Sequence, residues 1–271
     1  MNVLVTGSSG FIGSALCKGL KETYPKITIF KFEMRDIQQM QDWRATLETY
    51  VKLSSCIFHI GAISSTDAAD INSVLFLNYE FSKILFDLAA KHNKHVVYSS
   101  SAATYGKGDN IPSTLYAWSK KMAEDYGLLV VPQFVSLRYF NVYGPDESHK
   151  GHMASVAFQA WKHSQTTKQP FQLLPGYPKR DFVYVKDVVR ANIYGWRQTP
   201  GSGVYDVGTG VAQPFEDVLN TLKIPFVYKG EENIPPWYQY FTQADENKFL
   251  PGWQPQYSLT QGLIDYLSYL N

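Results

Sequence analysis

Tyr116 and Lys120 are spaced so that they could act together as an acid/base pair. Both lie in a predicted helix over residues 116–128, where a separation of four places the two side chains on one face. A phenol titrates at about pH 10, so Tyr116 could act as a base near neutrality only if a neighbouring cation stabilised its phenolate. Lys120 would supply that cation, and Ser101, after a predicted strand, would hold a substrate hydroxyl in line. The spacing alone is common by chance, so the interpretation needs support from the rest of the chain.

Residues 3–13, Val-Leu-Val-Thr-Gly-Ser-Ser-Gly-Phe-Ile-Gly, read as a buried strand, a tight glycine turn and the start of a helix. Gly7, Gly10 and Gly13 have the spacing that lets a backbone turn, approach a pyrophosphate and pack a helix on a strand. A purely structural turn is the alternative, but the position of the motif favours a dinucleotide site. The cofactor contacts expected from this segment are Gly7, Ser9, Gly10, Phe11, Ile12 and Gly13. Tyr116 and Lys120 would complete the site at the nicotinamide and its ribose.

These groups need a scaffold, and the apolar pattern predicts one. Short runs rich in β-branched and aromatic residues alternate with helical patterns, which is typical of an α/β fold with a Rossmann-type doubly wound parallel sheet. The predicted strands are residues 3–6, 27–32, 56–60, 95–99 and 134–140, and the predicted helices are 11–22, 39–53, 74–91 and 116–128. Ligands of such sheets bind at the carboxyl ends of the strands, which gives weight to residues 61–65, 99–104 and 141–144.

We expect a dinucleotide-binding domain over residues 1–143 and a smaller α/β substrate-binding lobe over 144–180 and 209–271. The segment 181–208 is expected to return to the first domain. Its predicted elements are strands at 181–185 and 204–207 and a helix at 187–197, and a last helix is predicted at 259–270.

The bulk composition argues for small-molecule partners. A net charge of +1 over 271 residues provides no broad field for nucleic acid or an anionic membrane. Two isolated cysteines suggest neither a disulfide framework nor a metal site. No stretch reads as a membrane span or a signal peptide. We expect a cytoplasmic protein, a homo-oligomer, with no metal.

Several motifs occur together in one order along most of the chain. They are residues 6–13, His59-Ile-Gly-Ala62, Tyr98-Ser-Ser-Ser-Ala102, Tyr116 with Lys120, Arg138-Tyr-Phe-Asn-Val-Tyr-Gly-Pro145 and Arg180-Asp-Phe-Val-Tyr-Val185. In this combination the chain resembles the extended short-chain dehydrogenases/reductases of the nucleotide-sugar epimerase branch. Within that family, residues 149–158, 179–185 and 238–245 are most similar to the ADP-L-glycero-D-manno-heptose 6-epimerases.

The resemblance implies oxidation of a sugar carbon to a transient ketone and return of the hydride to the opposite face. It places Tyr116 on one side of that carbon and Lys150 on the other, although a loop lysine such as Lys150 would otherwise be read as a solvated surface residue. A lysine base must be uncharged near neutral pH, which requires burial or neighbouring positive charge. The substrate contacts implied by the resemblance are Ser101, Asn141, His152, Arg180 and Tyr238. An ion pair of Arg180 with Asp181 is the structural alternative to a grip on the sugar diphosphate.

The resemblance leaves the cofactor open between NADP and NAD. The loop after the second strand is short, and Lys31 and Arg35 could accept a 2′-phosphate, which favours NADP slightly, while Asp36 and Ile37 could line the adenine. The remaining implied cofactor contacts are Gly61, Ala62, Ser64, Asn78 and Val142.

Three alternatives to the heptose-type reaction stay open. One is another nucleotide-sugar epimerase and another is a ketone reductase built on the same site. The third is a non-catalytic dinucleotide-binding protein. Dehydration is disfavoured, because relatives that eliminate water carry an acidic pair after the strand serine, where this chain has Ala102 and Ala103.

Overall fold

The computed structural model describes residues 1–64, 70–108, 111–198, 201–234 and 238–270. The chain forms two compact units. The first unit comprises Met1–Arg138, Val189–Tyr205 and Leu250–Trp253, and the second comprises Tyr139–Val188, Asp206–Phe249 and Gln254–Asn271.

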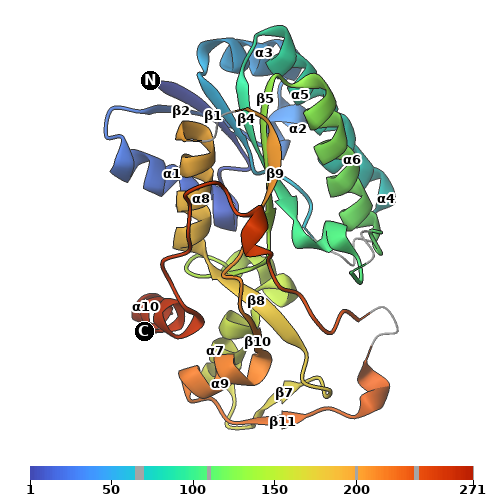
Figure 1. Ribbon diagram of the computed structural model, residues 1–271, viewed down its shortest axis with the longest axis vertical. Helices are drawn as coiled ribbons and strands as arrows, with labels where there is room; N and C mark the ends of the chain where they lie inside the picture. Colours follow the sequence, from blue (N-terminus) through green and yellow to red (C-terminus); the bar gives the residue numbers. More distant parts are fainter. Residues whose placement is uncertain (65–69, 109–110, 199–200, 235–237, 271) are drawn as a thin grey trace. The chain divides into compact units, whose positions relative to one another are not determined.

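The first unit is built on a six-stranded sheet in the order β2-β1-β3-β4-β5-β9 (Figure 1). The strands are β1 (Asn2–Thr6), β2 (Thr28–Phe32), β3 (Cys56–His59), β4 (His95–Ser101), β5 (Gln133–Tyr139) and β9 (Gly203–Val207). β1 pairs in parallel with β2 and β3, and β3 pairs in parallel with β4. This confirms the predicted Rossmann-type α/β fold.

Helices cover both faces of this sheet. In Figure 1, α1 (Phe11–Thr23) and α8 (Val185–Arg197) lie on one side, and α5 (Phe81–Lys91) and α6 (Leu115–Val130) on the other. α3 (Trp43–Leu53) packs on α5, and their apolar faces join one core with Leu4, Ile57 and Val96 from the strands. Burial of this core holds the helices against the sheet and so fixes the positions of the carboxyl ends of the strands.

Two predicted helices differ from those in the structure. The predicted helix 39–53 is α3 alone, and a separate short helix, α2 (Met34–Gln39), precedes it. Glu33 and Asp36 form a capping box on α2, and the Asp42 carboxylate accepts from the Ala45 N–H at 3.1 Å to begin α3. The predicted helix 74–91 is α4 (Ile71–Leu75), a π-helical turn η1 (Phe76–Glu80) and α5 in succession. Apolar periodicity predicts neither the capped break nor the π turn.

The second unit contains two small sheets. One has the order β10-β8-β6, with β6 (Asn141–Tyr143), β8 (Lys179–Tyr184) and β10 (Ala212–Pro214), and the other pairs β7 (Phe171–Leu173) with β11 (Phe226–Tyr228). Its helices are α7 (Val156–Thr166), α9 (Phe215–Leu222) and α10 (Leu259–Leu270), and short 3₁₀ turns include η3 (Ser148–Met153).

Residues 181–208, which are expected to return to the first domain, contribute elements to both units. β9 joins the central sheet, whereas β8 pairs with β6 and β10 of the second unit. The reason is that the β8 backbone finds its partners in β6 and in the segment after Tyr240, where the Lys179 and Asp181 N–H groups donate to Tyr240 and Thr242 carbonyls.

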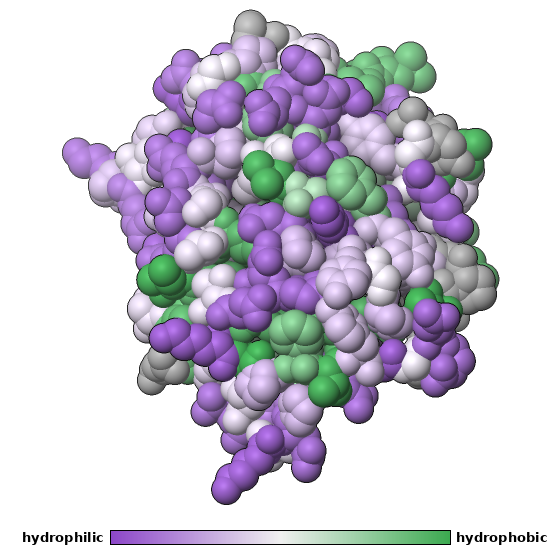
Figure 2. Space-filling model, turned by 60° about the horizontal axis from the view of Figure 1, so that its bottom comes forward, coloured by the Kyte–Doolittle hydropathy of each residue, from purple (hydrophilic) through white to green (hydrophobic). Residues whose placement is uncertain are grey.

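The surface is mixed in polarity. On the face drawn in Figure 2, hydrophilic residues predominate and hydrophobic ones form separate small groups. Within the described ranges, no helix combines the length and the apolar character needed to cross a bilayer.

Candidate functional site

The glycine turn between β1 and α1 is shaped by two close backbone contacts. Gly7 has φ +66°, and a Cβ on it would overlap the backbone of Gly61 after β3. A Cβ on Gly13 would overlap the Gly7 carbonyl, whereas at Gly10 the nearest atom is the Gly7 carbonyl oxygen at 3.4 Å. The turn therefore needs glycine at 7 and 13 for its own packing, and at Gly10 it leaves room beside the backbone for a ligand.

A cavity of about 240 Å³ opens beside this turn. It lies wholly in the first unit and is lined by Thr6, Gly7, Phe32, Glu33, Met34, Ile37, Gly61, Ala62, Ile63, Leu77 and Phe81. Apolar walls with one carboxylate beside a glycine turn suit the adenosine half of a dinucleotide. Of the predicted cofactor residues, Gly7, Ile37, Gly61 and Ala62 line this cavity.

Glu33, directly after β2, is a lining residue that the sequence analysis missed. Its carboxylate accepts hydrogen bonds from Ser8 Oγ at 2.5 Å and from the Ser9 N–H and Oγ, both at 3.0 Å. An acidic group in this place binds ribose hydroxyls and repels a 2′-phosphate. The usable signal was the acidic residue at the end of the second strand.

The slight preference for NADP is therefore not supported. Lys31 and Arg35 are exposed and do not line the cavity. Asp36 is also outside it, because its carboxylate accepts the Glu33 N–H at 2.7 Å to cap α2. Ser9 is bonded to Glu33, Phe11 is buried and Ile12 is half-buried at the start of α1.

The structure brings Ser101 and Tyr116 together. Ser101 ends β4, and Tyr116 lies in the first turn of α6, whose N-cap Thr114 accepts from the Ala117 N–H at 3.2 Å. The two hydroxyl groups are hydrogen-bonded. Burial raises the pKa of Tyr116, and the bond with Ser101 acts in the opposite direction.

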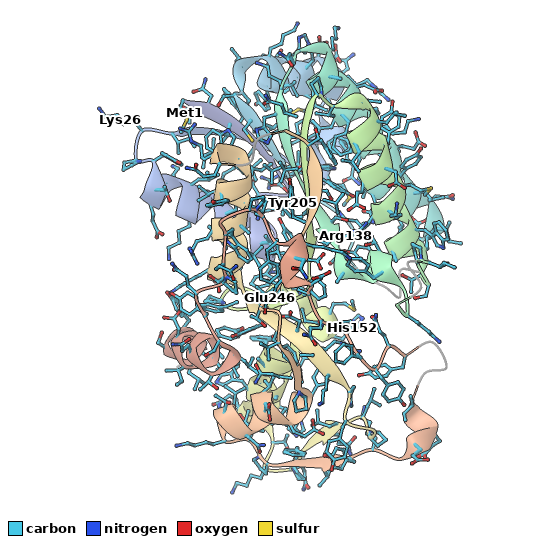
Figure 3. All side chains as sticks on the ribbon, viewed as in Figure 1. Met1, Lys26, Arg138, His152, Tyr205 and Glu246 are labelled. Carbon is cyan, nitrogen blue, oxygen red and sulfur yellow. The ribbon has the colours of Figure 1, made fainter. Side chains whose placement is uncertain are left out.

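Lys120 follows Tyr116 by one helical turn and is buried. Burial lowers the pKa of Lys120 to about 7, while the Glu124 carboxylate favours its charged form. Glu124 is in turn ion-paired with Arg138 at 2.5 Å and accepts from Ser136 Oγ at 2.8 Å. Arg138 lies near the end of β5 and is labelled in Figure 3. A lysine in these surroundings can change charge near neutral pH.

A chain of buried hydrogen bonds connects the glycine turn to the helix that carries Tyr116. Thr6 Oγ1 bonds His59 Nδ1 at 2.7 Å, and His59 Nε2 bonds Ser82 Oγ at 2.8 Å. Ser82 Oγ donates to the Asn78 carbonyl at 2.8 Å, and Asn78 Nδ2 donates to Ser119 Oγ at 3.0 Å. The Ser119 hydroxyl donates to the Tyr116 carbonyl at 2.7 Å.

The side chain of Asn78 also fixes the segment after β3. It lies in the π turn η1, accepts from the Ile63 N–H at 2.8 Å and donates to the Ile63 carbonyl at 3.0 Å. Asn78 thus holds the backbone of Ile63, which lines the cavity. Ser64, the next residue along, is exposed.

In the second unit, Lys150 lies in η3, a turn interrupted at Gly151 (φ +56°). Burial lowers the pKa of Lys150, and Glu147 opposes this shift. Glu147 is itself fully buried and accepts from the Ser155 N–H and Oγ, both at 2.6 Å, and from Tyr266 OH at 3.1 Å. A buried anchor therefore holds the segment that carries Lys150.

Arg180 is buried in β8 and stands over two rings. Its guanidinium carbon is 5.3 Å from the centroid of the Tyr238 ring and 5.7 Å from that of Phe215, and its N–H groups donate to the Lys179 and Gln239 carbonyls. Burial lowers the pKa of Arg180.

Asp181 is bound elsewhere. Its carboxylate accepts from the Thr209, Gly210 and Ala244 N–H groups at 2.7–3.1 Å. These bonds account for the Asp181 carboxylate, and the guanidinium of Arg180 donates to backbone carbonyl groups instead.

The other predicted substrate residues lie on edges and turns of the second unit. Asn141 begins β6, is exposed, and its Oδ1 accepts from Thr242 Oγ1 at 3.5 Å. His152, labelled in Figure 3, is exposed in η3. Val142, a predicted cofactor contact, is half-buried in β6.

Comparison with known proteins identifies the class. Residues 3–208 match the family model described as the NAD dependent epimerase/dehydratase family. The match covers more than half of the chain and includes the glycine turn, the Ser101–Tyr116–Lys120 group and Arg180. The chain belongs to this family and is an enzyme of the nucleotide-sugar epimerase type.

Solved structures agree with this assignment. The chain is 28% identical to the ADP-L-glycero-D-manno-heptose-6-epimerase of Helicobacter pylori, with a TM-score of 0.86 over 99% of this chain and 96% of that one. It is 25% identical to the UDP-N-acetylglucosamine 4-epimerase of Methanobrevibacter ruminantium, with a TM-score of 0.84 over 99% and 97% of the two chains. The UDP-glucose 4-epimerase of Thermotoga maritima shares the fold at 24% identity, with a TM-score of 0.82 over 100% and 98%.

Proposed function

We propose that this enzyme is an NAD-dependent epimerase of a nucleotide-linked heptose, of the ADP-L-glycero-D-manno-heptose 6-epimerase type. The observation that carries the proposal is the hydroxyl pair of Ser101 and Tyr116, with Lys120 one turn later, in a member of the epimerase/dehydratase family. The heptose assignment is supported by residues 149–158, 179–185 and 238–245 and by the likeness to the Helicobacter enzyme.

NAD is preferred over NADP because the Glu33 carboxylate lines the cavity and would repel a 2′-phosphate. The residues that would hold the dinucleotide are the 7–13 turn at the pyrophosphate, the cavity lining at the adenosine and Lys120 at the nicotinamide ribose. When bound, NAD supplies the acceptor and donor of the hydride. All other parts of the reaction fall to side chains of this protein.

Tyr116 takes the proton of the sugar hydroxyl as the carbon becomes a ketone, and Ser101 holds that oxygen in line. The ammonium group of Lys120 supports the phenolate form of Tyr116. When the hydride returns to the opposite face, the Lys150 ammonium group donates a proton to the ketone oxygen, and its lowered pKa makes that proton easier to release. Proton exchange with solvent then returns Tyr116 and Lys150 to their starting forms. Arg180 grips the diphosphate, and Tyr238, Asn141 and His152 border the sugar.

The reaction is tested by incubating the purified protein with ADP-D-glycero-D-manno-heptose in deuterated water, without added cofactor, and following the sugar by proton NMR. We expect conversion to the L-glycero epimer with no deuterium on the inverted carbon, because the same hydride returns. In a parallel sample with added NADH or NADPH, steady consumption of the reduced cofactor would indicate a reductase instead. Parallel samples with ADP-, GDP- and UDP-hexoses test other epimerase substrates.

The assignment of the second base is tested by Lys150→Met, with Lys179→Met as the matched lysine. Lys179 is exposed in β8, next to Arg180. We expect Lys150→Met to lower turnover about 10²-fold or more, the usual contribution of an acid/base group. Loss of turnover in Lys179→Met with retention in Lys150→Met would move the second base to Lys179.

A further inference from the structure

The ammonium group of Lys120 lies over the aromatic ring of Tyr98, which touches neither substrate nor cofactor in the proposed reaction. Its Nζ is 4.3 Å from the centroid of the Tyr98 ring, and both side chains are almost fully buried, at 2% and 0% exposure. A cation within about 6 Å of a ring centroid is attracted to the negative face of the ring, most strongly where water is excluded. Tyr98 belongs to β4, three residues before Ser101.

The ring of Tyr98 is held in place by its neighbours. Phe86 meets it edge-on at 5.5 Å between centroids, and Phe134 stacks on it at 5.8 Å. The hydroxyl group of Tyr98 donates to the Lys120 carbonyl at 3.5 Å. One side chain thus contacts both the backbone and the ammonium group of Lys120.

We propose that Tyr98 is the positioning residue of Lys120, and that its ring face holds the ammonium group where it can support the phenolate of Tyr116. This inference rests on the function proposed above. The ring supplies a fixed negative face from β4, and the hydroxyl group adds only a long contact, at 3.5 Å, with the Lys120 carbonyl.

The other charged and titratable groups around Lys120 do not replace the ring. Glu124 lies one turn further along α6, but its carboxylate is already ion-paired with Arg138 on β5. His59 on β3 is buried, and burial together with Lys120 lowers its pKa to about 3, so it is neutral near pH 7. Tyr116 lies one turn earlier on α6. Its neutral phenol does not stabilise the Lys120 ammonium group; instead, the ammonium group stabilises the phenolate of Tyr116. Stabilisation from the β4 side therefore comes from Tyr98.

The direction of the effect follows from these contacts. Without the ring face, Lys120 would lose its proton at a lower pH, and less ammonium would be present near neutrality. The phenolate of Tyr116 would then be less stable, so its pKa would rise. The acidic limb of the pH–rate profile should move to higher pH.

The experiment compares Tyr98→Phe, which keeps the ring and loses the hydroxyl, with Tyr98→Leu and Tyr98→Met, which lose the ring. For the two variants without the ring, we expect the apparent pKa of the acidic limb of the kcat profile to increase by about one unit. We expect kcat at pH 7 to fall about tenfold, because a cation–ring interaction of ordinary strength is lost. KM for the sugar nucleotide should change less than about twofold, because Tyr98 binds no substrate. Tyr98→Phe should retain most of the wild-type profile.

A second measurement does not depend on turnover. The ultraviolet difference spectrum between each protein and its Tyr116→Phe derivative reports ionisation of the Tyr116 phenol, which should begin at higher pH in the ring-less background. The proposal would be overturned if the Leu and Met variants kept the wild-type pH profile, or if Tyr98→Phe shifted the profile as much as Tyr98→Leu does. If the wild type epimerises no sugar nucleotide, the proposed function fails, and the difference titration still decides the role of Tyr98. Having both Leu and Met variants guards against one of them failing to fold.

Discussion

The Ser101–Tyr116–Lys120 site of the first unit and the 141–152 segment of the second differ in how their side chains are held. The first site stands on β4 and α6 and is tied to the glycine turn by buried hydrogen bonds through His59 and Asn78. The second presents Asn141 and His152, which are exposed, and Lys150, which is held mainly through the buried Glu147. Under the proposed function, Ser101 and Tyr116 therefore stand on regular elements, whereas Lys150 stands on a turn whose position depends on one buried carboxylate.

The strongest test of this comparison is Tyr116→Phe. We expect kcat to fall by about 10²–10⁴-fold, because the proton of the substrate hydroxyl loses its acceptor. Tyr126→Phe, on the same helix, is the matched control: it removes the surface bond from Tyr126 to Asp87 (2.6 Å) and should leave kcat unchanged. Steady-state kinetics with thermal melts of both variants measure this. Normal turnover in Tyr116→Phe would place the chemistry elsewhere.

The buried network predicts a specific loss of stability in acid. His59 has a folded pKa of about 3 against about 6.5 when unfolded, so the unfolded chain binds the extra proton first and stability falls as the pH drops below about 6.5. Between pH 6.5 and pH 5, His59 alone should contribute about 2 kcal/mol to this fall. Urea unfolding at several pH values should show a shallower acid slope in His59→Gln. His149→Gln, at an exposed position, is the control, and equal slopes in the two variants would contradict the prediction.

Replacing Glu33 tests the cavity beside the glycine turn of the first unit, where the dinucleotide is proposed to bind. Glu33→Gln should weaken NAD binding about tenfold, because a charged acceptor becomes a neutral one, and should narrow the preference over NADP. Asp36→Asn removes an equal charge just outside the cavity and should change the NAD/NADP ratio little. Calorimetric titration with both dinucleotides provides the readout. A stronger change in the ratio for Asp36→Asn than for Glu33→Gln would reject the assignment of Glu33.

The smallest effect is expected at the exposed edge of the second unit. Asn141→Ala should raise KM for the sugar nucleotide about fivefold, the value of one ordinary hydrogen bond, and leave kcat within about twofold. A loss in kcat as large as that of Tyr116→Phe would show that Asn141 takes part in the reaction and not only in binding. His152→Asn provides a second exposed position for the same assay.

The sequence was informative where local geometry demands particular residues. Gly7 and Gly13 could be identified because no other residue fits their contacts, and Tyr116 with Lys120 because a helix fixes their spacing. The partners of β8 could not be predicted, since strand pairing depends on distant segments. Glu33 was missed because the short segment after the second strand was read as lacking the loop that usually carries an acidic residue. Its hydrogen bonds with Ser8 and Ser9 join residues more than 20 positions apart, which local pattern does not predict.

The π turn η1 limits which mutations this part of the chain can accept. It places Asn78 between Ile63 and Ser119 by accommodating one residue more than an α-helical turn does. Deleting one residue from 76–80 would close the wide turn into a regular α-helical one and leave the flanking helices nearly in phase, but it would remove the bulge on which Asn78 stands. Asn78 and Ser82 could then no longer reach their present partners together. At this point the chain should tolerate an exchanged side chain far better than a changed length.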